Sequence, residues 1–230
     1  MTHANRHREA AQGAERERAF ADWLGKGEFP EIKSAVQQRS IKTAFALLES
    51  AAALLRDHTF DALSIEQICA GADATVGAFY GRFENKQSFF SALQRLTCLR
   101  SKVALAEFVQ QATQAPCTLS QLCHMMATLT VQRYRSNIGI YRAALKHADE
   151  GAWEQFRLLG DVYRQALTQL LSPHLPHIPS RDRGVRIRFA YQVMIGTLVH
   201  ATLNDPGPLH LDDPAMPEEL AGIVFQYLAG

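Results

Sequence analysis

Side chains able to hold a phosphate group are concentrated between Ser64 and Lys86. Thr75 opens a short helical pattern, and a hydroxyl at a helix N-terminus lies at the positive end of the helix dipole, where anions bind. Gly77 lacks a side chain, which lets another molecule approach the backbone closely. Tyr80 and Lys86 then supply a phenol and an ammonium group. Residues of these types at this spacing indicate contact with the backbone of a nucleic acid.

Two short helices joined by a tight turn are expected to position these residues. Ser64 is predicted to cap the first helix, and Gln67, three residues later, completes a capping box. Thr75 caps the second helix, which is expected to end near Arg82. Asp73 lies in the turn, where its short side chain tolerates a left-handed backbone. With a longer helix before it, this is the helix-turn-helix arrangement, whose second helix enters the major groove of DNA.

The predicted DNA contacts combine hydroxyls, small residues and cations from this motif and the helix before it. Val76 and Ala78 are small enough to touch thymine methyl groups, whereas Phe79 is expected in the core. The full set is Arg39, Lys42, Ser64, Thr75, Val76, Gly77, Ala78, Tyr80, Arg82 and Lys86. Residues 33–100 contain 8 basic and 6 acidic residues. With so small a positive surplus, we expect DNA affinity to be modest and strongly salt-dependent.

This stretch resembles the DNA-binding domain of the tetracycline-repressor-like (TetR) family of transcriptional regulators. The matching residues keep the family's spacing: Ser64, Glu66 and Ile68, then Ala72, Asp73, Ala74 and Thr75, then Gly77, Tyr80, Phe83 and Lys86. The similarity covers about residues 40–95 in detail, with Asp73 and Thr59 standing where the family usually has Gly. It implies a homodimeric regulator that binds a double-stranded DNA operator and a small-molecule effector, most simply a repressor that the effector releases.

Composition argues against several other classes of protein. Lys and Arg total 24 against 23 for Asp and Glu, so the net charge is +1, too small for binding nucleic acid by bulk charge. Apolar residues make up 47% of the 230 residues, which is typical of a globular protein. No segment approaches the roughly 18 apolar residues of a membrane span, and the charged N-terminus does not resemble a secretory signal. A cytoplasmic protein that does not bind membranes is expected.

The four cysteines do not indicate a metal site or a disulfide framework, because no two of them form a CxxC pair. They are Cys69, Cys98, Cys117 and Cys123. No metal or other cofactor is therefore predicted.

The periodicity is helical from residue 39 onward and predicts an all-α protein. Three segments are expected. Residues 1–37 form a charged N-terminal extension, for which a frayed or flexible segment is favoured over a functional arm. Residues 38–95 form the helix-turn-helix domain. Residues 96–230 form a ligand-binding and dimerisation domain, with helices expected near 118–134, 138–148, 151–172, 181–204 and 215–229.

The helix expected at 181–204 carries apolar residues on two faces, as in a helix shared between its own core and a partner chain. Together with the helix at 215–229 it is predicted to form a four-helix dimer interface. The interface residues are Phe189, Val193, Gly196, His200, Leu220 and Val224. An ordinary buried helix is the alternative explanation of the same pattern.

Aromatic residues with a few polar groups predict an apolar ligand pocket in the same domain. The candidates are His124, Met125, Tyr141, Trp153, Phe156, Tyr163 and Tyr191, although residues of these types more often belong to the core. Residues 101–230 contain 11 basic and 11 acidic residues, a balance that slightly disfavours a strongly ionic ligand.

An enzyme and a ligand-independent DNA-organising protein are the two alternatives to a ligand-responsive regulator. Enzyme activity is not predicted, because the chain lacks a phosphate-binding loop and the GxSxG and HExxH motifs. His174 and His177 lie in a proline-rich loop without carboxylate or cysteine neighbours. A ligand-independent DNA-organising protein, whose C-terminal helices serve only assembly, stays open as the alternative.

Overall fold

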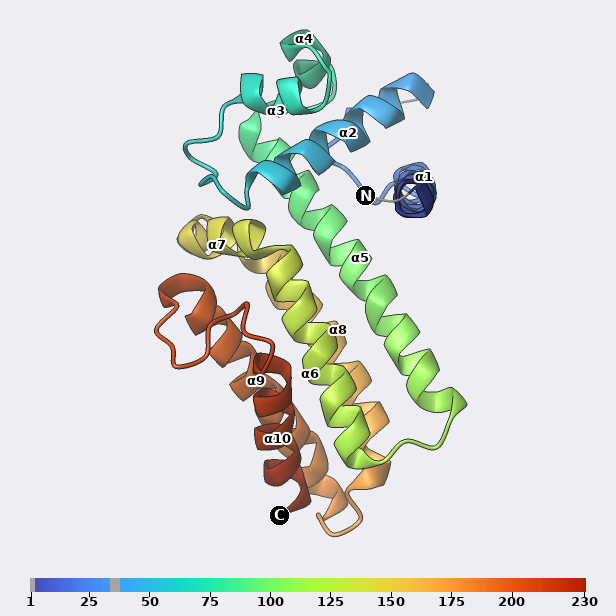
Figure 1. The fold of residues 1–230 in the computed structure, drawn as a ribbon, viewed down its shortest axis with the longest axis vertical. Coiled ribbons are helices and arrows are strands. Elements are labelled where there is room, and N and C mark those ends of the chain that lie inside the picture. The colour runs from blue at the N-terminus through green and yellow to red at the C-terminus, as the bar shows by residue number, and fades with distance from the viewer. Residues whose placement is uncertain (1–2, 34–37) are drawn as a thin grey trace. The chain divides into compact units, whose positions relative to one another are not determined.

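The computed structural model describes residues 3–33 and 38–230, which form α-helices joined by turns and loops, with no strand among them (Figure 1). The prediction of an all-α protein is confirmed. The chain divides into two compact units, Met1–Leu96 and Thr97–Gly230. Helix α5 (Lys86–Gln114) begins in the first unit and continues in the second. In the described part of the chain, no helix has the length and apolar character needed to cross a bilayer.

The first unit is built from α1 (His3–Gly25), α2 (Gln38–Leu54), α3 (Ile65–Gly71), α4 (Val76–Tyr80) and the start of α5. Its core contains side chains that are at most 1% exposed: Leu47, Leu48, Ile68, Phe79, Phe83, Phe89 and Phe90. The ring centroids of Phe79, Phe83 and Phe89 lie 4.9–5.4 Å apart, a favourable spacing for aromatic pairs. A helix of five residues such as α4 is not stable alone, so this cluster holds it in place. The prediction that Phe79 belongs to the core is confirmed.

Helix α1 occupies most of the segment that composition suggested to be a frayed or flexible extension. Phe20 is fully buried, and its ring centroid lies 5.4 Å from that of Phe45 in α2 and 5.0 Å from that of Phe29. The end of α1 therefore contributes to the core of the first unit. Phe20 supplies the apolar contact, which the charged residues around it cannot supply. Residues 1–2 and 34–37 of the expected extension lie outside the described residues.

The contact between α2 and α3 leaves no room for a side chain at Gly71. Ser50 Oγ of α2 donates a hydrogen bond of 2.9 Å to the carbonyl oxygen of Ile68. A Cβ atom at position 71 would collide with this hydroxyl. This close packing fixes the position of α3 and of the turn that follows it.

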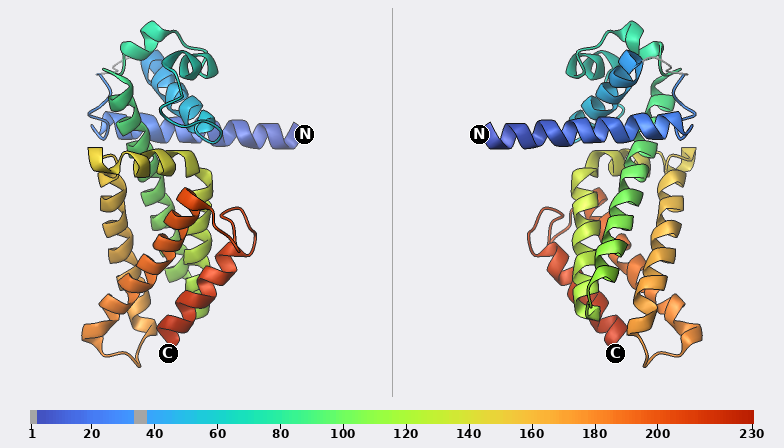
Figure 2. Two further views of the ribbon diagram at one scale, coloured as in Figure 1. Left: turned by 90° about the vertical axis from the view of Figure 1, so that its left-hand side faces the viewer. Right: turned by 90° about the vertical axis from the view of Figure 1, so that its right-hand side faces the viewer.

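The second unit contains the rest of α5 with α6 (Leu119–Ser136), α7 (Ile138–Lys146), α8 (Glu154–Leu171), α9 (Ser180–Asn204) and α10 (Met216–Ala229). Short 3-10 turns, Ala148–Glu150 and Ser172–His174, precede and follow α8. In this unit α5, α6 and α8 run side by side, and α7 crosses one end of α6 and α8 (Figure 2). The bounds of α6 to α10 agree with the expected helices to within a turn.

Candidate functional site

The two caps predicted for the helix-turn-helix are confirmed. The Ser64 hydroxyl accepts a hydrogen bond of 3.1 Å from the Gln67 backbone N–H, and the Gln67 side chain accepts one of 2.8 Å from the Ser64 N–H. The Thr75 hydroxyl accepts a hydrogen bond of 3.0 Å from the Ala78 N–H. A hydroxyl that accepts in this way can still donate its proton. Thr75 can therefore cap α4 and donate to a phosphate at the same time.

The turn between α3 and α4 has the expected left-handed residue. Asp73 has a φ of 49°, a conformation that Asn and Asp adopt more readily than other residues with a Cβ. The turn is closed by a hydrogen bond of 2.9 Å from the Ala74 N–H to the carbonyl of Cys69. Because the turn is short and bonded, the N-terminus of α4 has a fixed direction.

The N-terminal half of α4 offers an exposed surface that another molecule can approach. Gly77 is exposed, and the nearest atom to a Cβ built there is Thr75 Oγ1 at 3.8 Å, an ordinary contact distance. Tyr80 is 47% exposed and its ring lies edge-on to that of Phe79. Val76 and Ala78 are half-buried. The packing of the first unit therefore does not require glycine at position 77.

Two of the predicted phosphate ligands have hydrogen-bond partners inside the first unit. Arg82 donates to the carbonyl oxygens of Ser40 at 2.9 Å and Ala78 at 2.6 Å. Lys86 donates to the carbonyl oxygen of Phe60 at 2.6 Å and lies 4.6 Å from the centroid of its ring. Burial lowers the pKa of both side chains. Both cationic groups therefore link segments of the first unit to one another.

The cations on and near α2 are more accessible. Arg39 and Lys42 are exposed, and Lys42 Nζ lies 3.9 Å from a carboxylate oxygen of Glu17 in α1. Lys33, which sequence reasoning did not select, donates to the carbonyl oxygen of Tyr80 at 3.0 Å. It lies 47 residues from Tyr80, so no local pattern could have indicated this contact.

A cavity of about 600 Å³ lies between α6, α7, α8 and α9 of the second unit. Four predicted pocket residues line it: Tyr141, Trp153, Phe156 and Tyr191. Tyr163 is not in the lining but stacks on Tyr191, with 5.9 Å between ring centroids. The cavity is also lined by Phe189 and Gly196, which the sequence assigned to the dimer interface.

His124 and Met125, also predicted for the pocket, do not line this cavity. His124 is exposed, and its Nδ1 lies 3.1 Å from a carboxylate oxygen of Glu218 in α10. Met125 is half-buried, and the fold brings neither residue into the lining of this cavity.

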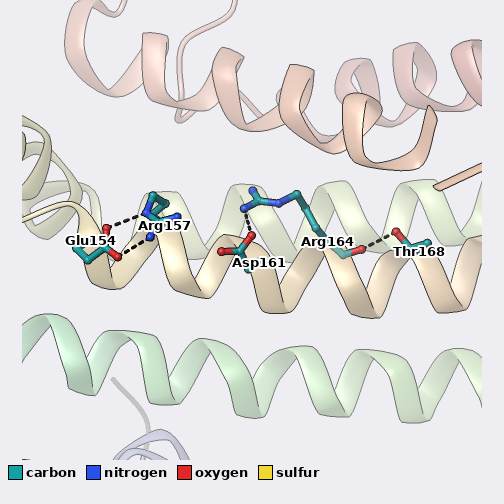
Figure 3. Close-up of polar contacts among 5 residues, drawn as sticks. All are labelled: Glu154, Arg157, Asp161, Arg164 and Thr168. Atoms are coloured by element: carbon teal, nitrogen blue, oxygen red, sulfur yellow. Dashed lines mark hydrogen bonds and ion pairs between the residues drawn. The ribbon is translucent and has the colours of Figure 1, made fainter. Parts of the chain in front are cut away.

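The cavity contains four arginines that the sequence analysis did not select and no acidic residue: Arg133, Arg157, Arg164 and Arg188. Two of them belong to α8 and have their own acidic partners (Figure 3). Arg157 donates two hydrogen bonds, of 2.7 and 2.6 Å, to Glu154, and Arg164 donates one to Asp161. Both guanidinium groups lie on the side of α8 that faces α9 (Figure 3).

An apolar face of α9 and α10 remains open. Phe189 is 48% exposed and Val193 is 39% exposed, while Ile223 and Tyr227 of α10 are 53% and 38% exposed. The ring centroids of Phe189 and Tyr227 lie 5.7 Å apart, which joins the two helices into one surface. We call these four residues together with Val185 the α9–α10 face.

Four of the six predicted interface residues are accessible on α9, since Gly196 and His200 are exposed as well as Phe189 and Val193. Leu220 and Val224 of α10 are only 4% and 2% exposed. They are buried in their own chain, where α10 packs along α6.

Two family models match the chain. The model described as bacterial regulatory proteins, tetR family, matches residues 47–93, which include α3 and α4. The model described as tetracyclin repressor-like, C-terminal domain, matches residues 118–228, which include the helices around the cavity. No curated protein matches the chain significantly.

Solved structures share the fold at low sequence identity. The fatty acid degradation regulator FadR from Bacillus halodurans is 14% identical, with a TM-score of 0.60 over 84% of this chain and 96% of that one. A transcriptional regulator from Aquifex aeolicus is 16% identical, with a TM-score of 0.56 over 79% and 97%. The ketosteroid transcriptional regulator KstR2 of Mycobacterium tuberculosis is 16% identical, with a TM-score of 0.53 over 84% and 95%.

Proposed function

Because the chain belongs to the tetR family of bacterial regulatory proteins, we propose that it is a repressor that a small molecule releases from its operator. The family consists of DNA-binding transcriptional regulators rather than enzymes. The proposal rests on two features that occur together in this one chain. The first unit has a capped α4 with an exposed N-terminal half, and the second has a cavity of about 600 Å³ with aromatic walls.

DNA is bound through α4 in the major groove. Thr75 donates to a phosphate, Gly77 lets the backbone come close to the groove, and the exposed phenol of Tyr80 reaches the neighbouring phosphates. Arg39 and Lys42 add positive charge from α2. Arg82 and Lys86 act by holding this frame, because their cationic groups already bind carbonyl oxygens of the first unit. The protein acts in the cytoplasm, where bacterial DNA lies.

The protein binds DNA as a homodimer joined through the α9–α10 face. Monomeric proteins rarely expose a continuous apolar surface, and this face offers aromatic and branched side chains on two neighbouring helices. Two-fold symmetry would present two copies of α4 to half-sites roughly 34–36 Å apart. Since α5 is part of both units, a ligand-driven movement of α5 would change the separation of the two copies.

The test is fluorescence anisotropy of the purified protein with labelled DNA fragments that flank its own gene, at two salt concentrations. Light scattering under the same conditions gives the mass of the free protein. We expect a dimer that binds one fragment saturably and more weakly at the higher salt concentration. Equal affinity for all fragments would contradict operator recognition.

Release by a ligand is tested with that fragment and a library of small organic molecules. A ligand that lowers DNA affinity must itself bind more weakly, by the same factor, when the operator is present. Ligands that bind the protein but leave its DNA affinity unchanged would favour the ligand-independent DNA-organising alternative.

A further inference from the structure

The wall of the cavity contains a guanidinium group surrounded by tyrosines. The Cζ atom of Arg133 lies 4.3 Å from the ring centroid of Tyr163 and 5.7 Å from that of Tyr134. Its Nη2 atom lies 3.5 Å from the hydroxyl of Tyr191, too long for a strong hydrogen bond. Arg133 itself is half-buried and lines the cavity.

Arg133 has no counter-ion in the part of the chain that the structure describes. Its Nε and Nη1 atoms are fully buried and form no hydrogen bond. The hydroxyl of Tyr141, which lines the same cavity, is also buried without a hydrogen-bond partner. The lining of one cavity therefore includes a positive charge from α6 and a hydroxyl donor from α7 that the protein leaves unsatisfied.

The surrounding tyrosines cannot neutralise this charge. Burial raises the pKa of Tyr134, Tyr141 and Tyr163 above the usual value for a phenol, so all three are neutral at physiological pH. A guanidinium group remains protonated under the same conditions. Arg133 is thus a permanent cation among neutral rings.

A buried charge without a partner is costly, and such groups are normally paired with an opposite charge. The two α8 arginines at the cavity follow this rule, because Arg157 binds Glu154 and Arg164 binds Asp161 (Figure 3). The fourth arginine, Arg188, also has no acidic partner among the described residues, but it is exposed to solvent. Arg133 is therefore the one of these four whose guanidinium nitrogens are both buried and unpaired. An anionic group entering the cavity would supply the missing charge and would interact strongly with Arg133, because its buried guanidinium nitrogens are shielded from water.

We propose that the effector is an apolar organic acid whose single carboxylate binds Arg133 and the Tyr141 hydroxyl. A carboxylate can accept hydrogen bonds from both groups. The body of the acid packs on the rings of Trp153 and Phe156, which line the cavity. The cavity volume of about 600 Å³ lies within the range of about 300–1,000 Å³ that is usual for pockets of small organic ligands. This inference rests on the proposal that the effector binds in this cavity.

The test measures direct binding of small acids to the full chain without DNA. The panel consists of phenylalkanoic and medium-chain alkanoic acids, each compared with the primary amide and the phosphate monoester of the same body. Calorimetric titration is expected to show that the best acid binds at least about tenfold more tightly than its amide, because only the acid carries the negative charge that pairs with the Arg133 guanidinium. Amides that bind as well as the acids, or a panel in which no acid binds, would overturn the proposal. Preferred binding of the phosphate monoester would overturn the assignment of a carboxylate.

Substitutions test whether Arg133 is the residue that binds the carboxylate. Arg133→Met keeps a long apolar stem, removes the charge, and is expected to reduce acid binding at least about tenfold while leaving amide binding nearly unchanged. Arg181→Met is the matched control, because Arg181 is an exposed arginine of the same unit that does not line the cavity. An Arg133→Met variant that still prefers the acid over the amide would refute the role of Arg133. The comparison of acid with amide in the unaltered protein does not depend on any variant.

The DNA measurement separates this inference from the proposed function. Acids that bind through Arg133 but leave operator affinity unchanged would support the anion site and contradict ligand-controlled release. Uncharged ligands that bind in the cavity and release DNA would support ligand-controlled release and overturn the anion site.

Discussion

Two glycines of the helix-turn-helix unit should respond in opposite ways to the same substitution. Gly77 lies in the exposed N-terminal half of α4, where a Cβ meets no atom of the chain closer than 3.8 Å. Gly71 ends α3, where a Cβ collides with Ser50 Oγ. Neither glycine has a positive φ, so Ala can adopt the backbone conformation at both positions. The effect of each substitution therefore depends on the space around the added methyl group and on what binds there.

For Gly77→Ala, we expect the free energy of unfolding to rise by about 0.5–1 kcal/mol, because Ala loses less backbone entropy than Gly in a helix. DNA affinity should nevertheless fall at least about tenfold, since the added methyl separates α4 from the groove wall. For Gly71→Ala, we expect the free energy of unfolding to fall by about 1–3 kcal/mol, because the Ser50 hydroxyl must move and its buried bond to Ile68 is strained.

Urea unfolding followed by circular dichroism measures the two stabilities, and fluorescence anisotropy measures binding to the operator fragment. A Gly77→Ala protein that binds DNA as tightly as the unaltered protein would refute the close approach at α4. A Gly77→Ala protein that unfolds more easily would refute the open surroundings on which the reasoning depends. Gly71→Ala serves as the matched control, because it lowers stability without adding a group to the proposed DNA surface.

Three other substitutions test the remaining assignments. Lys86→Met should lower the free energy of unfolding by about 1–2 kcal/mol and leave the salt dependence of DNA binding unchanged, because the ammonium group binds loop carbonyls. A fall in the salt slope by about one would instead indicate a phosphate contact. Tyr80→Phe should leave stability unchanged and weaken binding to all DNA sequences alike, as measured by anisotropy with operator and unrelated fragments. Phe189→Glu should give monomers in analytical ultracentrifugation, whereas Leu158→Glu, at an exposed leucine of α8, should remain dimeric.

The parts of the first unit that the sequence could predict are those decided by neighbouring residues. The capping box of Ser64, the cap of Thr75 and the left-handed Asp73 each depend on residues at most three positions away. Lys86 was assigned to DNA because it is a cation beside the motif. Its carbonyl partner at Phe60 lies 26 residues earlier and becomes a neighbour only after the chain has folded.

The cavity shows more clearly that contacts between distant residues cannot be predicted from the sequence. Aromatic residues of the C-terminal helices predicted a pocket, and four of them line it. The balance of basic and acidic residues in the C-terminal segment slightly disfavours a strongly ionic ligand, because it counts Arg157 and its partner Glu154 in the same way as Arg133. Only the fold reveals that one arginine has a partner and the other does not. Charge composition therefore predicts solubility, and the charge of a site depends on which pairs the fold forms.

Effector binding and dimerisation should be linked, because they use the same stretch of α9. Phe189 lies on the exposed α9–α10 face and also lines the cavity. A ligand that contacts Phe189 therefore changes a side chain on which the partner chain would pack.

Coupling between two binding events is reciprocal. The factor by which an acid from the panel changes the dimer dissociation constant must therefore equal the factor by which dimerisation changes the affinity of the protein for that acid. We expect calorimetric titrations above and below the dimer dissociation constant to give different acid affinities, and sedimentation with saturating acid to give a dissociation constant changed by the same ratio. Equal acid affinities for monomer and dimer would mean that the cavity and the α9–α10 face act independently, and that control of DNA binding must run through α5 alone.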